Sequence, residues 1–288
     1  MNSTFRRELD QRLLDALKDG PLHEILLACR SINADVRLRR KEAHVYVRGN
    51  RIAALGLDRR RNPRLRLHSK YCDDTGLGLL DCHQTESERR FAVSADFVTH
   101  WKASLASVCT AARNAREGLE GAFEAEIVAA NLAGTPVEIF DRQVQVPRLK
   151  RERLDMLGLT VDPATGKGAF VAIELKLGGD NRVQELPQQV QRYGNALAPR
   201  GQVRPDIIAS YRNVVTQMRE LGIPAPTPDR FQEELGMLAL VVVVGKASAE
   251  QLRRAQRAAA TVECRIGWVE LHSENRRIES PEKWRWFE

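Results

Sequence analysis

The sequence predicts an α/β fold in which a mixed β-sheet is flanked by helices, after an N-terminal region of helices and a β-hairpin. Three observations support this prediction. Helical and extended patterns alternate along most of the chain. The run at residues 237–244 is apolar without interruption, as in a strand covered on both faces. Residues 162–168 hold strong turn signals between two extended patterns, which predicts an antiparallel hairpin.

The first expected elements are two helices. Leucines recur at helical spacing across residues 5–18 and form one apolar face. Gly20 and Pro21 follow directly, and this pair ends a helix because glycine favours a left-handed cap and proline cannot continue the hydrogen bonding. A second, shorter helix is expected at residues 22–29, where apolar residues dominate.

A β-rich stretch follows these helices. Strands are expected at residues 44–48 and 51–57, joined by Gly49 and Asn50. Both residue types accept the positive φ angles of a tight hairpin turn, so the dipeptide predicts a hairpin at this point. A further strand is expected at residues 64–71.

The remaining elements build the larger part of the fold. They are a helical region at 96–132, strands at 137–146, 153–161 and 169–176, a helix at 186–197, a strand at 237–244, a helix at 249–260 and a strand at 264–271. Gly134 and Pro136 end the helical region, and strands and helices then alternate as in an α/β protein.

Charge and composition narrow the functional classes. Lys and Arg number 45 against 38 Asp and Glu, which gives a net charge of +7 and a pI near 9.4. This balance suits a polyanionic partner such as nucleic acid, and it is also compatible with a basic surface that binds nothing. The hydrophobic content of 43% can fill the core of one large domain or two modest ones.

Cysteine use and apolar runs predict a cytoplasmic location. The five cysteines are odd in number and scattered, so they do not resemble a disulfide framework and fit a reducing compartment. No apolar run approaches the roughly 18 residues of a membrane span, and no signal peptide is recognisable. Walker loops, dinucleotide fingerprints and a Ser-His-Asp order are also missing, which disfavours nucleotide-driven enzymes and hydrolases of those kinds.

The first third of the chain is rich in arginine and lysine. Two explanations stay open for these side chains: they grip phosphates from a sheet, or they form a solvated face and pair with the chain's own acids. The residues are Arg37, Arg39, Arg40, Lys41, Arg48, Arg51, Arg59, Arg60, Arg61, Arg64, Arg66 and Lys70.

The predicted hairpin around residues 162–168 carries the most informative residues. Counting outward from its centre sets Asp155 opposite Glu174 or Leu175, on strands that run about 4.8 Å apart. Because strand side chains alternate, Glu174 and Lys176 share one face. Charged groups at the end of a buried strand are costly unless they are paired or bound to metal. Two carboxylates and a lysine are therefore expected to converge.

Such a group suits a hard divalent cation. Mg²⁺ prefers oxygen ligands and keeps several waters, so Asp155, Glu174 and the backbone carbonyl of Leu175 would be sufficient. Lys176 would then orient or deprotonate the nucleophile and offset charge on a phosphate. The competing interpretation is an ordinary surface ion pair, because Glu-x-Lys triplets are common.

The neighbouring helices add further candidates. Gln189 flanks the apolar stripe of the helix at 186–197, one turn before Tyr193, and could hold a water or a phosphate. In the upstream helix, Glu124 lies at the border of the apolar face. It is preferred to Glu120 as a third metal ligand, whereas Glu126 is expected to face solvent.

Other candidates are weaker. His68, Cys72, Cys82 and His83 lack the paired spacing of a zinc site. Lys150 and Arg153 precede Asp155 and could contact the scissile strand, or they could guard a solvated strand edge. The tail at residues 284–286 could stack on bases, although packing of the tail is the preferred interpretation.

In this order, the residues resemble the PD-(D/E)XK nuclease superfamily over about residues 115–197. They are Glu124 on a helix, Asp155 on a hairpin, the triplet Glu174-Leu175-Lys176, and Gln189-x-x-x-Tyr193 on the following helix. The Gln-x-x-x-Tyr element is most similar to the RecB-like branch. Two departures are Leu154, in place of the proline that names the superfamily, and the length of the hairpin.

The resemblance implies a restriction-endonuclease-like core, with a four-stranded mixed sheet flanked by helices, at residues 96–288. It also implies a Mg²⁺- or Mn²⁺-dependent endo- or exonuclease that hydrolyses DNA, with Tyr193, Lys150 and Arg153 near the substrate. The alternative is a non-catalytic nucleic-acid-binding or regulatory protein on the same fold. Residues 1–95 lie outside the match and form a basic α/β region of unknown role. A homodimer is compatible with the sequence, and no membrane partner is expected.

Overall fold

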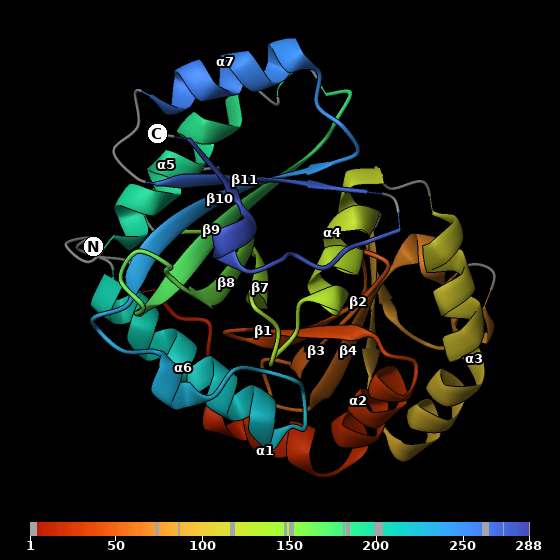
Figure 1. Cartoon of the computed structure of the whole chain (residues 1–288). Helices are drawn as coiled ribbons and strands as arrows, with labels where there is room; N and C mark the ends of the chain where they lie inside the picture. The colour runs from red at the N-terminus through yellow and green to blue at the C-terminus, as the bar shows by residue number, and fades with distance from the viewer. Residues whose placement is uncertain are drawn as a thin grey trace. The chain divides into compact units, whose positions relative to one another are not determined.

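A computed structural model gives the fold of the chain (Figure 1). The described residues are 5–72, 75–85, 87–115, 119–146, 149, 153–180, 182, 185–198, 204–260, 265–272 and 274–287. The chain divides into two compact units, each with its own six-stranded sheet. Unit 1 comprises Met1–Arg6, Glu126–Val215 and Pro224–Glu288, and unit 2 comprises Arg7–Ala125 and Thr216–Ile223. The predicted α/β class is confirmed.

Unit 2 combines helices with a sheet of strand order β1-β2-β3-β4-β6-β5, in which all neighbours are antiparallel. Helix α3 packs against β2 and β3, and α2 packs against α3 and β4. The elements are α1 Gln11–Lys18, α2 Pro21–Ser31, β1 Asp35–Arg39, β2 Glu42–Val47, β3 Asn50–Leu57, β4 Pro63–His68, η1 Ser69–Tyr71, η2 Gly76–Leu79, β5 His83–Gln84, β6 Glu88–Ala92, α3 Ala95–Asn114 and α4 Leu119–Ala130. The last residues of α4, from Glu126, belong to unit 1.

The β2–β3 hairpin differs from its prediction by one residue. Val47 pairs with Asn50, so the two turn residues are Arg48 and Gly49, with φ angles of 49° and 85°. Positive φ at both central residues is the geometry of a type I′ turn. Asn50 belongs instead to β3, where its side chain is buried and its amide donates to the carbonyl of Ala112. A contact between distant parts of the chain therefore sets the register.

Other boundaries also differ from expectation. The first helix begins only at Gln11, because the side chain of Asp10 accepts from the backbone of Leu13 and caps it. The expected strand at 64–71 ends at His68, and a 3₁₀ turn follows. The expected helical region at 96–132 contains two helices, α3 and α4, with residues 116–118 outside the described part of the chain. Strands β1, β5, β6 and β12 and helix α6 were not predicted.

Unit 1 contains a mixed sheet of order β12-β11-β10-β9-β8-β7. Strands β7, β8 and β9 are antiparallel neighbours, β9, β10 and β11 are parallel, and β12 is antiparallel to β11. The elements are β7 Glu138–Val144, β8 Leu154–Val161, β9 Gly168–Leu177, α5 Leu186–Leu197, α6 Arg204–Glu220, η4 Pro228–Arg230, β10 Gly236–Val244, α7 Ala249–Ala259, β11 Ile266–Leu271, η5 Pro281–Lys283 and β12 Arg285–Phe287. The last residues of α6, from Thr216, belong to unit 2.

Helices α5 and α7 cover one face of this sheet. The side chains of Val241 and Val243 on β10 pack with Leu186 and Val190 of α5, and with Ala255 of α7, in one buried cluster. This packing explains why α5 forms over its predicted residues, because its apolar stripe at spacings of three and four is fully buried.

The central strands have the expected composition. Every residue of β10 from Leu238 onward is buried, which confirms the apolar run at 237–244 as a strand in the interior of a sheet. None of the described helices is long and apolar enough to cross a membrane. The sequence predicts one domain at residues 1–95 and a second at residues 96–288. Whether each of these folds independently stays a prediction.

Candidate active site

The β8–β9 hairpin brings Asp155 and Glu174 together. Met156 pairs with Ile173, so the same antiparallel register places Asp155 opposite Glu174. Oδ2 of Asp155 accepts from the backbone amide of Leu175 at 2.9 Å. The two carboxyl groups are also hydrogen-bonded to each other. The predicted hairpin pairing is confirmed.

Burial changes the acidity of this pair. Glu174 is only 5% exposed. Burial, followed by the charge and hydrogen bond of Asp155, raises the pKa of Glu174 well above its usual range, and the charge of Lys176 acts in the opposite direction. Two carboxyl groups in such contact cannot both ionise easily unless positive charge joins them. The pair is therefore poised to take up a proton or a cation.

Lys176 supplies one positive charge beside the pair. Its side chain is 8% exposed, and its ammonium group donates to the carbonyl oxygen of Leu175 at 2.9 Å. Its charge also contributes to lowering the pKa of Asp180, which is mainly lowered by a hydrogen bond from Arg182, to about 2. The carbonyl group of Leu175, which is a predicted metal ligand, therefore already accepts a hydrogen bond from the ammonium group of Lys176.

Gln189 presents a buried oxygen that accepts no hydrogen bond from any described residue. Glu174 pairs with Val241 across β9 and β10, and neighbours in register share a face, so Glu174 lies on the face that α5 covers. Gln189 lies between the buried Leu186 and Tyr193 along α5. Its Oε1 is buried and has no hydrogen-bond partner among the residues that the structure describes. Such an acceptor is unusual in a folded protein and points to a missing donor or cation.

The other predicted site residues have different surroundings. Glu124 is 4% exposed on α4 and belongs to unit 2, so its membership of a site in unit 1 stays a prediction. Glu126 pairs with Arg276 at 2.7 Å instead of facing solvent alone. Tyr193 is buried, at 2% exposure. Lys150 lies outside the described residues.

Arg153 is exposed just before β8, as expected of either a substrate contact or a strand edge.

Within the described residues, no three His, Cys, Asp or Glu side chains are grouped so that they could hold a metal ion. Asp155 and Glu174 lie together with the carbonyl group of Leu175 and the ammonium group of Lys176, and α5, which carries Gln189, covers the face that bears Glu174.

Sequence reasoning missed Gln143. Arg142 pairs with Met156 and Val144 pairs with Leu154, so Gln143 stands in register with Asp155 on β7. Its φ of 50° lies in the left-handed region, where a residue with a side chain is uncommon. Backbone strain of this kind tends to occur at functional sites. The sequence gives no signal for it, because glutamine shows no preference for this conformation.

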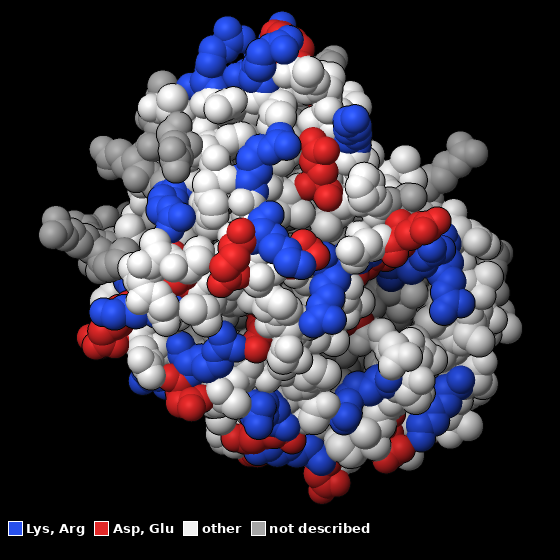
Figure 2. Space-filling model, viewed as in Figure 1, with Lys and Arg blue, Asp and Glu red and all other residues white. Residues whose placement is uncertain are grey.

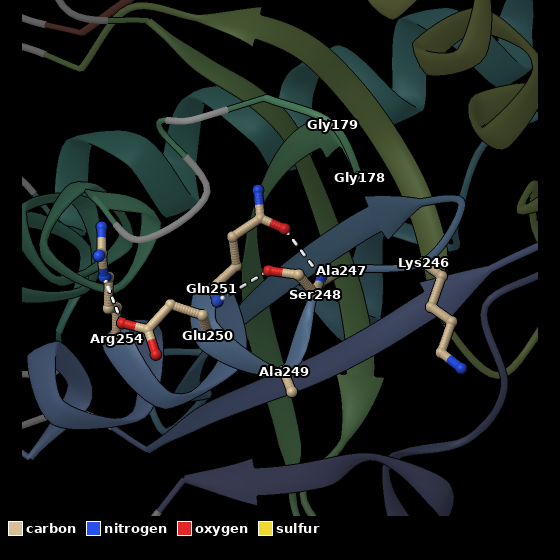
Figure 3. A pocket seen from close by; sticks show the side chains of 9 residues that line it. All are labelled: Gly178, Gly179, Lys246, Ala247, Ser248, Ala249, Glu250, Gln251 and Arg254. Atoms are coloured by element: carbon tan, nitrogen blue, oxygen red, sulfur yellow. Dashed lines mark hydrogen bonds and ion pairs between the residues drawn. The ribbon is translucent and has the colours of Figure 1, made fainter.

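A pocket of about 820 Å³ opens where the parallel strands β9 and β10 end (Figure 3). Gly178 approaches the backbone of Lys246 so closely that a Cβ there would meet Lys246 O at 2.5 Å. The first turn of α7 lines the pocket, but Ser248 and Gln251 already cap it reciprocally, as Figure 3 shows. The pocket begins two residues after Lys176, at the carboxyl end of the same strand.

The remaining candidates are structural. His68 accepts from the backbone of Lys70 through Nδ1, and Cys72 is buried, in keeping with the weak case for a zinc site. Trp286 lies under the guanidinium of Arg265, whose carbon is 4.2 Å from the ring centre, and β12 pairs with β11. The tail is therefore packed, as preferred from the sequence.

Comparison of the chain with protein-family models, curated proteins and solved structures gave no match.

Proposed function

We propose that this chain is a Mg²⁺- or Mn²⁺-dependent nuclease that hydrolyses phosphodiester bonds in DNA, with its active site on a restriction-endonuclease-like core in unit 1. The observation that supports this most is the contact between the half-buried carboxyl group of Asp155 and the buried carboxyl group of Glu174, beside the buried Lys176. Buried ionisable groups with strongly perturbed pKa values concentrate at functional sites, and an exposed surface ion pair would show neither property.

The residues fit a hard divalent cation. Asp155 and Glu174 offer carboxylate oxygens, and Leu175 offers a carbonyl oxygen. Mg²⁺ and Mn²⁺ bind oxygen ligands and need only a few from the protein. Glu124 is proposed as a further ligand. When bound, the cation would supply Lewis acidity at the phosphate and lower the pKa of water.

The chain's own groups have separate tasks in this proposal. Lys176 places a desolvated positive charge at the site, where it stabilises the negative charge that develops on the phosphate oxygens. Oε1 of Gln189 accepts a hydrogen bond from the attacking water and orients it. Arg153, exposed at the entrance to β8, contacts the backbone of the scissile strand. The same contact is proposed for Lys150.

Cleavage assays test the proposal. Plasmid and end-labelled oligonucleotides are incubated with the full chain and Mg²⁺, Mn²⁺ or a chelator. We expect metal-dependent cleavage that Lys176→Ala and Asp155→Ala each reduce by at least about 100-fold. Lys167→Ala is the matched control, because Lys167 is an exposed lysine at the opposite end of the same hairpin.

Equal cleavage by wild type, Lys176→Ala and Asp155→Ala would sink the proposal. Salt-sensitive DNA binding without turnover at any divalent concentration would instead assign the chain to non-catalytic nucleic-acid binding. Circular dichroism of each variant separates loss of activity from loss of folding.

A further inference from the structure

Unit 2 contains a hollow of about 830 Å³, and five of its ten lining residues are basic. Arg12 comes from α1, Lys41 from the β1–β2 turn, and Arg59, Arg61 and Arg64 from the β3–β4 turn and the start of β4. The β1–β2 and β3–β4 turns lie at the same end of an antiparallel sheet, because two strands separate them. Residues from three separate segments therefore converge.

Four of these basic side chains pair with no acid in the part of the chain that the structure describes. Within the described residues, Arg12, Lys41, Arg59 and Arg61 make no ion pair, and all four are exposed. Arg64 forms its ion pair with Glu42 at 3.3 Å. Unpaired, converging positive charge repels itself, so it stabilises the fold only when an anion joins it.

Arginines elsewhere in the same sheet behave differently. Arg66 bonds to both Glu42 and Glu88, and Arg51 bonds to Glu88 at 3.0 Å. The two explanations of the arginine-rich segment thus apply to different residues. Arg51, Arg64 and Arg66, which lie on strands, pair with acids of the sheet, whereas the other four basic side chains of the hollow form no ion pair among the described residues.

The β3–β4 turn is held in one conformation although this strains a residue. Arg61 has φ 70°, a left-handed angle at which glycine is the default. Backbone bonds join Asp58 N to Asn62 O at 2.9 Å and Arg61 N to Asp58 O at 3.0 Å. The turn itself would favour glycine at this position. An arginine there is explained if its side chain binds a ligand.

The two acids of the lining do not neutralise the hollow. Asp10 caps α1 by accepting from Leu13 N at 3.0 Å, and Asp58 accepts from Asn62 N at 2.8 Å. A hydrogen bond from the backbone of Asn62 is the main cause that lowers the pKa of Asp58, so its carboxylate stays committed to the turn. Five basic and two acidic side chains give the lining a net charge of +3.

We propose that this hollow binds the sugar-phosphate backbone of nucleic acid and so provides the substrate grip of the nuclease, an inference that rests on the proposed function. Separate cationic groups on three segments match the spaced charges of a phosphate chain. The described exposed large hydrophobic residues, Leu27, Leu79, Leu119 and Val161, do not line the hollow, so it lacks the apolar anchors of a membrane-binding surface. On the face that Figure 2 shows, basic and acidic side chains are interspersed, so the hollow is distinguished by its lining and not by general surface charge.

Binding of labelled DNA to the full chain in a chelator tests the inference without cleavage. The variant Arg59→Ala/Arg61→Gly removes two charges, and glycine suits the positive φ of residue 61, so the turn keeps its geometry. We expect affinity for a duplex of about 20 base pairs to fall about tenfold or more at about 0.1 M salt. The slope of log affinity against log salt should fall in magnitude by about two. Arg60→Ala, in the same turn but outside the lining, should change affinity less than about twofold.

Equal effects of Arg60→Ala and the double variant would overturn the inference. So would unchanged DNA binding combined with lost binding to phosphatidylserine vesicles, because the hollow would then serve a membrane. Cleavage by the double variant at saturating DNA separates this inference from the proposed function. Wild-type turnover with a raised KM supports the grip, whereas wild-type turnover with an unchanged KM contradicts the grip and leaves the nuclease standing. If no form of the chain cleaves DNA, the grip still stands or falls on the binding measurement.

Discussion

The carboxyl group of Asp155 is hydrogen-bonded to that of Glu174 across the β8–β9 hairpin, at the end of strands that are otherwise almost wholly apolar. Burial and then the neighbouring charge raise the pKa of Glu174, while Lys176 partly compensates. Two carboxyl groups in contact hold a shared proton at pH values where exposed carboxyl groups have lost theirs. Both the stability of the fold and the binding of a metal ion should therefore depend on pH.

The first prediction concerns stability without metal. Because the pKa of Glu174 is raised by folding, its stabilising effect is complete below the ordinary carboxyl pKa and is lost as pH rises towards the raised value. Glu174→Gln removes this dependence. We expect the free energy of unfolding of Glu174→Gln to exceed that of wild type by about 1–2 kcal/mol near pH 9, and to match it near pH 4. Urea unfolding in a chelator measures the difference.

Glu234→Gln serves as the matched control, because it makes the same change of an acid to its amide at an exposed residue of unit 1. Its free energy of unfolding should stay within about 0.5 kcal/mol of wild type at both pH values. A Glu174→Gln variant that becomes less stable than wild type as pH rises would contradict the assignment of a raised pKa.

The second prediction links metal binding to proton release. A divalent cation favours two ionised carboxylates, so binding should displace the proton that Asp155 and Glu174 share. Titration calorimetry with Mn²⁺ in buffers of different ionisation enthalpy should show release of about one proton per ion near neutral pH. Affinity should rise with pH. Heat that does not depend on the buffer, or silence on titration, would count against a metal site at this pair.

The third prediction concerns the buried oxygen of Gln189. Gln189→Met removes an acceptor that has no donor among the described residues while keeping the length of the side chain. We expect the free energy of unfolding to stay unchanged or to rise by about 1 kcal/mol, because an unsatisfied buried polar atom is costly. Cleavage should fall by about tenfold or more. Loss of stability with normal cleavage would show that Gln189 is only structural.

The parts that local patterns determine could be predicted from the sequence. Helix α5 covers its predicted residues because its apolar spacing and the flat apolar sheet beneath it agree. The β8–β9 hairpin follows from turn residues near its tip, and alternation along the strands then places Glu174 and Lys176 on one face. Counting limits the partner of Asp155 to Glu174 or Leu175, and the register of the structure decides for Glu174.

The remaining features depend on contacts between distant residues. Asn50 enters β3 because its amide reaches the carbonyl of Ala112, and a strand of three residues such as β12 exists only because β11 is there to pair with it. Gln143 adopts a left-handed angle within β7. Local secondary-structure propensities do not contain information about contacts between distant residues. These features could therefore not be predicted from the sequence.

The fourth prediction concerns this strained position. Gln143→Gly should accept φ 50° without cost, so we expect unfolding free energy within about 0.5 kcal/mol of wild type, whereas the β-branched Gln143→Val should lose about 1–3 kcal/mol. Because Gln143 stands in register with Asp155, both variants should also lower cleavage. Equal stability of the glycine and valine variants would show that the position carries no strain.

The fifth prediction concerns the ion pairs of unit 2. Burial alone would raise the pKa of Glu42, but hydrogen bonds from His44 and Arg66 and the charge of Arg66 lower it to about 2. The stability that Glu42 contributes is therefore present above the ordinary carboxyl pKa of 4.5 and is lost as pH falls towards about 2. Glu42→Gln should lower the free energy of unfolding by about 2 kcal/mol near neutral pH.

Urea unfolding followed by far-UV circular dichroism measures this effect at several pH values. The gap between wild type and Glu42→Gln should close as pH approaches about 2, because wild-type Glu42 is then protonated and its bonds to Arg66 lose their charge. Glu250→Gln is the control: Glu250 pairs with three arginines, but it is solvent-exposed, so its loss should not measurably change unfolding. A gap that stays constant with pH would mean that Glu42 acts through packing and not through charge.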